Sequence, residues 1–420
     1  MSAVEGLDVI LQAGEVAEPE HSCRAWVGVP LIQPVQIFVA GDGEAAEDAR
    51  ALADAIATLI AEIAPAAFEA EPPCGGVHCA TECAAQHDAR VRKLLAWVGT
   101  ADSPSDESES FAQAWRADGH DALAVLPRGS EHNVALPVSL RELHTEMWDS
   151  AVTQAAYAVL VAAAVVDPEN RVFVSYRHSE GGDLAREVFH VLTEHRFDVF
   201  LDRFSLEPAA DFKERIEQEL VDKAFVIVVE TSTVEKSEWI EHEVGFARTH
   251  GLGVAAVNAG APAAFGIAEA QRLRLGRGDF DGAPPKLSDV GRDRLVQHVQ
   301  KLHGLTLADR RRRLQESLRL ELARSIDPAR IRRARGGVDV DGQPPYAIDV
   351  CTRPPRLEDY RTVGRRADGA SATAALVGPA AVAADRVDAL AWLESESAVR
   401  RWDEGDLALL ANHVAAGGGP

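Results

Sequence analysis

Apolar and polar residues alternate along the chain in two series, and each series predicts strands separated by amphipathic helices. The first series predicts strands at residues 35–41, 92–99 and 121–129, with a helix at 44–65. The second series is sharper and predicts strands at residues 171–176, 197–202, 223–230 and 252–258. Helical spacing lies between these strands, at residues 183–195, 211–222 and 237–251. Short apolar strands that alternate with helices indicate a parallel sheet covered on both faces, so we expect two α/β units.

The segments around the two series are less regular. A closing helix is predicted at residues 290–304, and the last part of the chain holds a strand candidate at 346–352 and a helical stretch at 385–417. We therefore expect six parts: a lead-in segment (1–32), a first α/β domain (33–135), a helical connector (136–168), a second α/β domain (169–305), a basic helical linker (306–337) and a small α/β or α+β C-terminal domain (338–420).

Length and charge narrow the class of protein. A chain of 420 residues is too long for one ordinary core, and 46% hydrophobic with 26% charged residues is the composition of a soluble globular protein. The net charge of −23 argues against nucleic-acid binding, because neutralising phosphates requires a basic face. A single nucleotide needs only a locally positive pocket and stays open as a ligand.

The sequence also predicts the compartment. The first 20 residues lack a basic region followed by an apolar one, so we expect no secretory signal. The most apolar run, 155–166, is shorter than the roughly 20 residues of a membrane span and is predicted to be a buried helix. Five cysteines, an odd number, fit reduced thiols better than a disulfide framework. A cytoplasmic protein without membrane contact is the expectation.

Residues 237–243 read SEWIEHE, and positions i and i+4 of a helix share one face, so Trp239 and Glu243 project together. Four motifs precede this segment in order: FVSYRHSEGGDLA (173–185), FDVFLD (197–202), SLEPAADFKERI (205–216) and KAFVIVVETS (223–232). The series resembles a Toll/interleukin-1 receptor (TIR) domain over about residues 170–305. It is most similar to the enzymatic branch that includes the axon-degeneration NAD hydrolase of neurons and bacterial antiphage effectors. The resemblance implies a flavodoxin-like parallel sheet, and the first α/β domain is then a candidate for a second, degenerate TIR-like unit.

The resemblance also implies an activity. In TIR enzymes that cleave NAD⁺, the acid four places after the tryptophan is catalytic, and Glu243 matches it. Cleavage of the nicotinamide–ribose bond passes through an oxocarbenium-like centre, which one carboxylate can stabilise. Nicotinamide is already a good leaving group, so the pair of carboxylic acids used by O-glycosidases is not required. NAD⁺ is then the substrate, no cofactor is expected, and the product is ADP-ribose or a cyclic isomer.

Six further residues are candidates for substrate binding, because they lie near the carboxyl ends of predicted strands or beside Glu243. They are Ser175, Tyr176, Arg177, Asp202, Ser232 and Trp239. The rings of Tyr176 and Trp239 suit stacking on nicotinamide or adenine, and the guanidinium of Arg177 suits a diphosphate. Each of these three also has a purely structural alternative, which is core packing for the rings and a solvated loop cation for Arg177. Asp202 has the alternative role of capping a loop or helix.

Three other features are weaker. Cys74, Cys79 and Cys83, with two nearby histidines, are residue types that bind zinc, but their spacing is not that of a usual finger, and no metal site is predicted. The run of four arginines at 310–313 is predicted to be a solvated helix face. The loop at 208–210 reads PAA where the TIR family usually has a glycine, which puts the loop geometry and the mode of self-association in doubt.

The two α/β series can be overlaid on each other. At an offset of about 132 to 135 residues, strand, helix and final strand recur, and Phe111 falls opposite Glu243. The overlay leaves two explanations open, an ancient duplication or two unrelated units of similar periodicity. In either case the first unit lacks the acid, so we expect chemistry in the second unit alone.

Two functional classes remain open at this stage. The first is a TIR-type NAD⁺ nucleosidase, expected to be a regulated bacterial immune effector with an unknown activating ligand or partner and with self-association through the TIR domain. The second is a non-catalytic TIR adaptor that acts by homotypic association. A weaker third reading is an enzyme similar to nucleoside deoxyribosyltransferases, which share the style of fold and a carboxylate mechanism.

Overall fold

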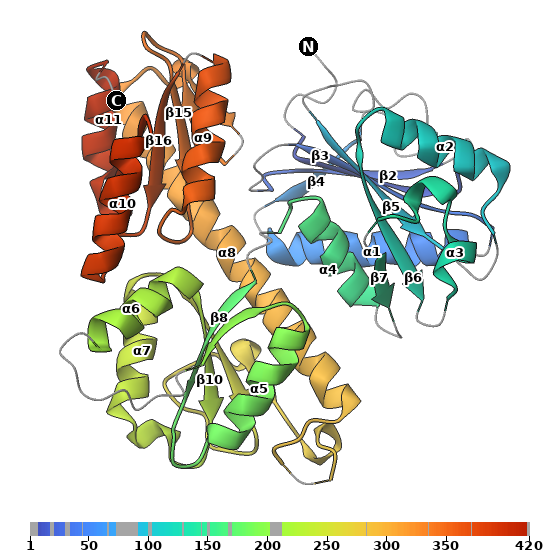
Figure 1. The fold of residues 1–420 in the computed structure, drawn as a ribbon, viewed down its shortest axis with the longest axis horizontal. Helices are drawn as coiled ribbons and strands as arrows, with labels where there is room; N and C mark the ends of the chain where they lie inside the picture. The colour runs from blue at the N-terminus through green and yellow to red at the C-terminus, as the bar shows by residue number, and fades with distance from the viewer. Residues whose placement is uncertain are drawn as a thin grey trace. The chain divides into compact units, whose positions relative to one another are not determined.

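The computed structural model divides the chain into two compact units, residues 1–168 and 169–420 (Figure 1). The described residues are 7–16, 21–29, 34–43, 45–64, 67–72, 91–99, 103–127, 130–143, 145–148, 152–166, 170–201, 212–282, 284–334, 336–370 and 372–417.

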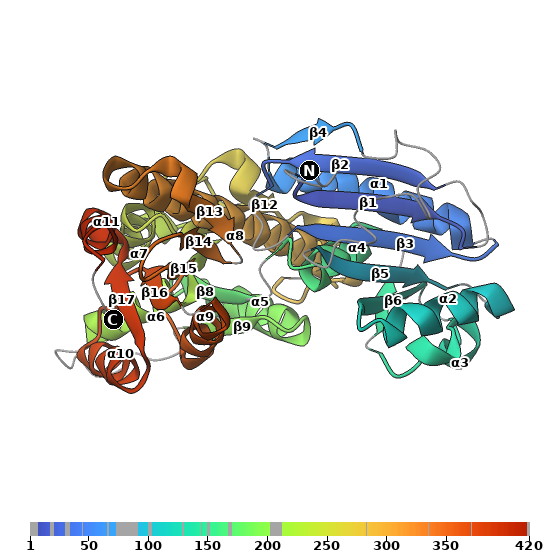
Figure 2. The same cartoon turned by 90° about the horizontal axis from the view of Figure 1, so that it is seen from above.

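The first unit is built on a seven-stranded sheet with the order β4-β2-β1-β3-β5-β6-β7 (Figure 2). Its strands are β1 (Val9–Gly14), β2 (Ser22–Val27), β3 (Val35–Gly41), β4 (Phe68–Ala70), β5 (Arg92–Val98), β6 (Asp121–Pro127) and β7 (Thr145–Trp148). The run from β1 to β7 is parallel, whereas β2 and β4 pair antiparallel at one edge. The three predicted strands of the first series are β3, β5 and β6.

Helices cover both faces of this sheet. They are α1 (Ala45–Ile63), α2 (Asp106–Ala117), α3 (His132–Ala135), the 3₁₀ turn η2 (Val138–Leu140) and α4 (Val152–Ala162). α1 packs on β1, β3 and α4, and its buried stripe includes Leu52, Ile56 and Ile60. α2 lies over the opposite face, where Ala112 packs with Phe38 of β3.

Two segments of the first unit differ from the prediction. Residues 1–32, expected to be a lead-in, contain β1 and β2. The pattern was obscured because β1 carries a buried Gln12, whose side-chain oxygen accepts a hydrogen bond from Gln36 of β3. The helical connector expected at 136–168 is also only partly helical, because η2 and β7 precede α4, and pairing of β7 with β6 overrides the local helical spacing.

The second unit begins with a five-stranded parallel sheet of the order β12-β11-β10-β8-β9. Its strands are β8 (Arg171–Tyr176), β9 (Asp198–Leu201), β10 (Phe225–Glu230), β11 (Gly253–Asn258) and β12 (Arg272–Arg274). This is the flavodoxin-like, doubly wound order, with the first strand in the interior and the second at an edge. The fold class expected for this part of the chain is confirmed.

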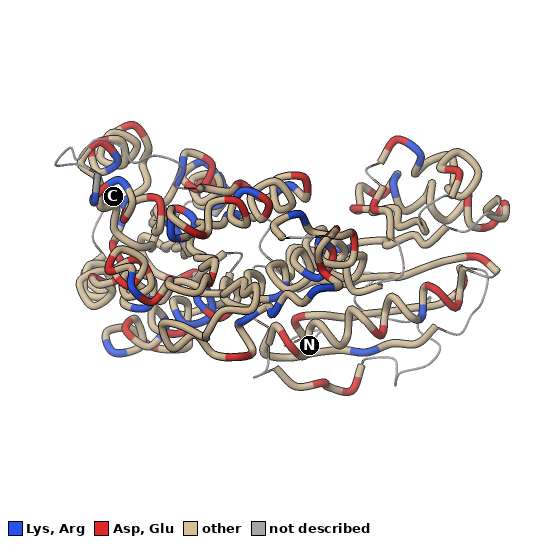
Figure 3. The backbone as a smooth tube through the Cα atoms, turned by 90° about the horizontal axis from the view of Figure 1, so that it is seen from below, with Lys and Arg blue, Asp and Glu red and all other residues tan. Residues whose placement is uncertain are grey.

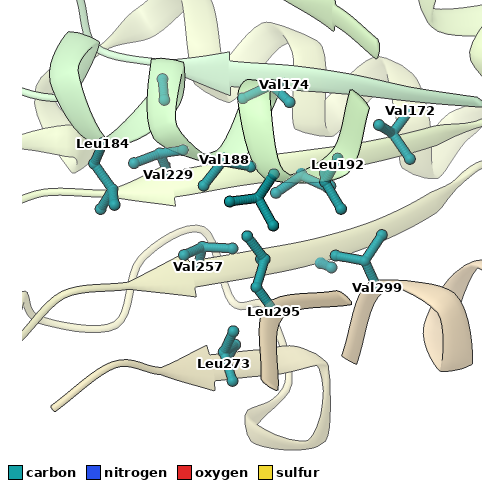
Figure 4. Packing of buried hydrophobic residues seen from close by; sticks show 14 of the residues in the cluster. Val172, Val174, Leu184, Val188, Leu192, Val229, Val257, Leu273, Leu295 and Val299 are labelled. Carbon is teal, nitrogen blue, oxygen red and sulfur yellow. The ribbon is translucent and has the colours of Figure 1, made fainter. Parts of the chain in front are cut away.

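Helices cover both faces of the second sheet. They are α5 (Gly182–Glu194), α6 (Phe212–Lys223), α7 (Glu238–Thr249) and α8 (Asp289–Ser325), with 3₁₀ turns η3 (Val234–Lys236), η4 (Glu269–Gln271) and η5 (Arg277–Asp279). α5 and the first half of α8 pack on one face, where Val188, Leu192 and Val299 meet the strands (Figure 4). α6 and α7 pack on the other face through Leu220 and Val244.

A third sheet completes the second unit, with the order β13-β14-β15-β16-β17. Its strands are β13 (Ile331–Ala334), β14 (Gly337–Val340), β15 (Tyr346–Val350), β16 (Thr373–Gly378) and β17 (Val399–Asp403). β15, β16 and β17 are parallel, whereas β13 and β14 are antiparallel. The surrounding helices are α9 (Leu357–Ala370), α10 (Ala384–Glu396) and α11 (Leu407–Ala415), with turns η6 (Pro328–Arg330) and η7 (Glu404–Asp406).

Helix α8 joins the two sheets of the second unit without a break. The sequence suggested a closing helix to 304 and a separate linker from 306, but α8 runs through 37 residues. Its second half packs Leu318 and Leu322 against the third sheet. The C-terminal stretch expected to be helical from 385 to 417 contains β17 between α10 and α11, because VRRWD pairs in parallel with β16.

Acidic and basic residues are interspersed along the elements of both units (Figure 3). No helix in the described part of the chain is long and apolar enough to cross a membrane. The apolar run at 155–166, predicted to be a buried helix, largely coincides with α4, whose Ala155, Val159 and Leu160 are buried.

Candidate active site

The carboxyl ends of β8 and β10 lie side by side where the strand order of the second sheet changes direction. From β8 the chain passes to β9 on one side and then returns to β10 on the other. In open α/β sheets, ligands bind at the carboxyl ends of strands beside such a switch point. Ser175 and Tyr176 end β8, and Ser232 follows β10. The prediction that these residues lie at one edge of the sheet is therefore met by the topology.

Glu243 lies on α7 and contacts the end of β8 through a side-chain hydrogen bond. The hydroxyl Oγ of Ser175 donates to Oε2 of Glu243. Both residues are only 2% exposed. A buried carboxylate requires donors, because transfer of a bare charge from water into the protein interior is costly. Among the predicted site residues that the structure describes, this contact is the most buried polar one.

Local sequence explains why α7 starts where it does. Ser237 is the N-cap, and its Oγ accepts a hydrogen bond from the backbone N–H of Ile240 at 3.4 Å. From this start, Ile240, Glu243 and Val244 fall on the buried face of the helix. The cap fixes where α7 begins, and packing of Ile240 and Val244 turns the same face, with Glu243, toward the sheet.

Arg177 and Ser232 belong to a network that ties the loop after β8 to the loop after β10. Arg177 Nη1 donates to the carbonyl oxygen of Thr233 at 3.0 Å and also to its hydroxyl, and it lies 3.9 Å from Oε1 of Glu180. Ser232 Oγ donates to Oε2 of Glu180 at 3.2 Å. Hydrogen bonding from Thr233 lowers the pKa of Glu180, and the bond from Ser232 and the charge of Arg177 act in the same direction. Glu180 and Thr233 were missed by the sequence analysis.

The two predicted stacking residues pack on opposite faces of the sheet. Tyr176 is half-buried against the α5 side and stacks on His178, with ring centroids 4.9 Å apart and planes 15° apart. Trp239 is half-buried against the α6–α7 side and lies 5.8 Å from the ring of His242. His242 in turn bonds Glu217 of α6 at 2.9 Å. Both aromatic residues therefore have packing roles, and the structure does not bring them together as one pair.

Several predicted features lie outside the described residues. These are Asp202, the loop at 208–210, and Cys74, Cys79 and Cys83 with their two neighbouring histidines. Among the residues that the structure describes, no cluster of three or more His, Cys, Asp or Glu side chains could hold a metal ion. The side chains of Cys23 and Cys351 are buried.

A buried ion pair at the same end of the sheet was not predicted. Glu230, the last residue of β10, binds Arg272 in bidentate fashion, with Nε–Oε2 at 2.7 Å and Nη2–Oε1 at 2.9 Å. Asn258 Nδ2 and the backbone N–H of Ala264 also donate to this carboxylate, at 2.7 and 3.0 Å. Burial raises the pKa of Glu230, but the hydrogen bonds from Arg272, Asn258 and Ala264 outweigh it, so the pKa is lowered. The sequence signal for this buried ion pair was the glutamate at the end of the apolar run KAFVIVVE.

Arg310 contradicts the prediction that the arginine run is a solvated face. It is 5% exposed and donates to three elements: to the carbonyl oxygen of Thr352 after β15 at 3.0 Å, to Oε2 of Glu404 at 3.0 Å, and to the carbonyl oxygen of His250. His250 is the C-cap of α7. Burial lowers the pKa of Arg310, while the charge of Glu404 acts in the opposite direction. Arg310 thus joins the helix that bears Glu243 to the third sheet.

The TIR domain family model matches residues 172–274, which run from β8 to β12. The matched segment contains Ser175, Trp239 and Glu243. No curated protein matches the chain. The second unit therefore contains a TIR domain, a five-stranded parallel sheet flanked by helices, and further α/β parts precede and follow it.

Proposed function

From the TIR domain at residues 172–274 we propose that the chain is an NAD⁺ nucleosidase, in which Glu243 is the catalytic residue. The observation that carries the proposal is the buried carboxylate of Glu243 at the switch point of the sheet, where it accepts a hydrogen bond from Ser175. In this fold, nucleotide-sized ligands bind at the carboxyl ends of the parallel strands, which is where the carboxylate of Glu243 lies.

The reaction needs little from the protein beyond one negative charge. As the bond between ribose C1′ and the nicotinamide nitrogen breaks, its electron pair leaves with nicotinamide and positive charge develops on the ribose. The carboxylate of Glu243 stabilises that charge electrostatically. Water then adds to C1′ and loses a proton, which gives ADP-ribose. If a nitrogen or oxygen of the substrate adds in place of water, the product is a cyclic isomer.

The burial of Glu243 supports a regulated enzyme. At 2% exposure, the residue meets a ribose only after the groups around it move. A nucleosidase whose catalytic residue is inaccessible without an activating signal suits a bacterial antiphage effector, because uncontrolled loss of NAD⁺ harms the cell that produces the enzyme. An activating ligand or partner, and self-association through the TIR domain, are parts of this proposal.

The other candidate residues take supporting roles in the proposed site. Tyr176 and Trp239 remain candidates for contact with the rings of NAD⁺, and Asp202 for contact with substrate. Arg177 and Ser232 already hold the two loops that border the site, which supports a role in shaping it. The diphosphate remains the proposed partner of Arg177.

Nicotinamide release from NAD⁺ by the purified full chain tests the proposal. The alternative is a TIR adaptor, which self-associates. It predicts no turnover of NAD⁺ at any protein concentration, with or without crowding agents. Deoxynucleosides added in place of NAD⁺ test the similarity to deoxyribosyltransferases. Turnover of NAD⁺ that disappears on replacement of Glu243 separates the nucleosidase from both.

A further inference from the structure

Ser175 occupies a position in β8 where packing alone favours an apolar side chain. β8 is an interior strand, and the two residues that precede Ser175 in it, Phe173 and Val174, are fully buried. Strand alternation places Phe173 and Ser175 on the face covered by α6 and α7, whereas Val172 and Val174 face α5. A buried parallel strand usually reads as a continuous apolar run. The hydroxyl at 175 therefore calls for an explanation other than packing.

The partner of that hydroxyl is the carboxylate of Glu243. A serine has a single O–H to donate, and here Oγ donates to Oε2 of Glu243. Hydrogen bonds to an ionised acceptor are shorter and stronger than neutral ones. Because Ser175 is 2% exposed and its proton is engaged, it is badly placed to bind substrate directly.

The first unit shows that the fold does not need this polar pair. There, β3-β5-β6-β7 repeats the order of β8-β10-β11-β12, and α2 precedes β6 as α7 precedes β11. Phe38 of β3 contacts Phe111 of α2 edge to face, with ring centroids 5.6 Å apart. An apolar pair thus joins the corresponding strand and helix. A strand and a helix in this arrangement therefore pack through apolar side chains, and packing does not require the serine–carboxylate pair of the second unit.

We propose that Ser175 is a positioning residue, whose hydroxyl fixes the orientation of the Glu243 carboxylate toward the ribosyl centre that it stabilises. This assignment replaces the direct substrate contact expected for Ser175, and it rests on the proposed nucleosidase function. A hydrogen bond to one oxygen of a carboxylate restricts the rotation of the whole group. Such orientation lowers the reorganisation needed in the transition state and leaves ground-state binding of NAD⁺ unchanged.

A matched pair of variants isolates the hydroxyl. Ser175→Thr and Ser175→Val add nearly the same volume to the strand and differ in one hydroxyl against one methyl, so any cost of overpacking is shared. In the full chain, we expect the kcat of Ser175→Thr to lie within about threefold of the wild-type kcat. The kcat of Ser175→Val is expected to be about 10- to 100-fold lower than that of Ser175→Thr. KM for NAD⁺ is expected to agree within twofold between the two variants. Equal kcat in Thr and Val, or a loss confined to KM, overturns the proposal.

A second readout does not depend on activity. Full-chain protein labelled with ¹³C at the glutamate carboxyl carbon gives a Glu243 resonance, assigned by its loss in Glu243→Gln. We expect this resonance to shift in Ser175→Val and to stay near the wild-type position in Ser175→Thr. An unchanged resonance in Ser175→Val shows that the hydroxyl does not hold the carboxylate. If wild type lacks turnover, the nucleosidase proposal fails by itself, while the resonance still decides whether Ser175 orients Glu243.

Discussion

Replacing Arg272 by Met is expected to destabilise the TIR domain strongly, because it leaves the carboxylate of Glu230 buried without its cation. In the wild-type protein the two side chains are 0% and 2% exposed and share two hydrogen bonds of 2.7 and 2.9 Å. Removal of one partner from a buried pair costs about 3–5 kcal/mol, most of it the cost of the uncompensated charge. Asn258 and Ala264 still donate to Glu230, which favours the lower end of that range.

Amide hydrogen exchange of the full chain, followed on peptides from β10 and β11, measures this loss locally. A cost of 3–5 kcal/mol corresponds to exchange faster by about 100- to 4,000-fold. Lys286→Met is the matched control, because its partner Asp281 and Lys286 itself are 63% and 70% exposed, and a surface pair contributes about 0–1 kcal/mol. The double variant Glu230→Met/Arg272→Met should recover most of the protection, since apolar pairs replace buried ion pairs at little cost.

The pH dependence gives an independent check. Because the pKa of Glu230 is lowered from 4.5, its ionised form stabilises the fold above that value, and this stabilisation is lost as the pH falls through the folded pKa. The difference in stability between wild type and Arg272→Met should therefore shrink as the pH falls toward and through 4.5. The variant protonates its uncompensated buried carboxylate, while wild type loses the stabilisation from its ionised form. Exchange in Arg272→Met within threefold of wild type at neutral pH would refute the reasoning.

Two further predictions concern the C-terminal part of the second unit. Glu404→Gln should speed exchange at His250 and at Thr352, because the buried Arg310 bonds both carbonyls and loses its half-buried counter-charge. Glu316→Gln, which removes a more exposed partner of Arg312, is the control and should leave both segments unchanged. Asp349→Asn should become more stable relative to wild type as the pH rises from 4 to 7, by up to about 3 kcal/mol. Burial raises the pKa of Asp349 to about 6, although the charge of Arg366 acts in the opposite direction. The wild type therefore loses stability as Asp349 ionises, and the variant does not. Exchange of β15 corrected for intrinsic rates measures this difference, and a constant difference across that range contradicts the assignment.

The apolar runs of the TIR domain predicted its strands well because both faces of the sheet are covered. β8, β10 and β11 are almost wholly buried, so apolar residues dominate their sequences and the strands can be recognised without knowledge of tertiary contacts. β16 was missed because TAALVG is rich in alanine, and β17 because this edge strand carries the exposed Arg400 and the half-buried Arg401. These two strands are specified by their pairing partners more than by their own residues.

Glu243 was singled out because its signal is local, whereas the long-range contacts of the TIR domain could not be predicted from the sequence. The spacing from Trp239 to Glu243 lies within one helix and survives in the sequence. The bond from Ser175 spans 68 residues, the pair of Glu230 and Arg272 spans 42, and Arg310 reaches Glu404 across 94. Contacts of this range depend on strand order, which no single segment encodes. Arg310 was misassigned for the same reason, since its partners lie on other elements.

Turnover of NAD⁺ by the full chain tests most directly the proposal that Glu243 is the catalytic residue. Wild type, Glu243→Gln and Glu238→Gln are compared at several protein concentrations, with release of nicotinamide as the readout. Glu238 lies on the same helix but is exposed, so its replacement controls for a change of charge on α7. We predict turnover in wild type and Glu238→Gln and a loss of at least about 100-fold in Glu243→Gln. Equal turnover in all three proteins would contradict the account.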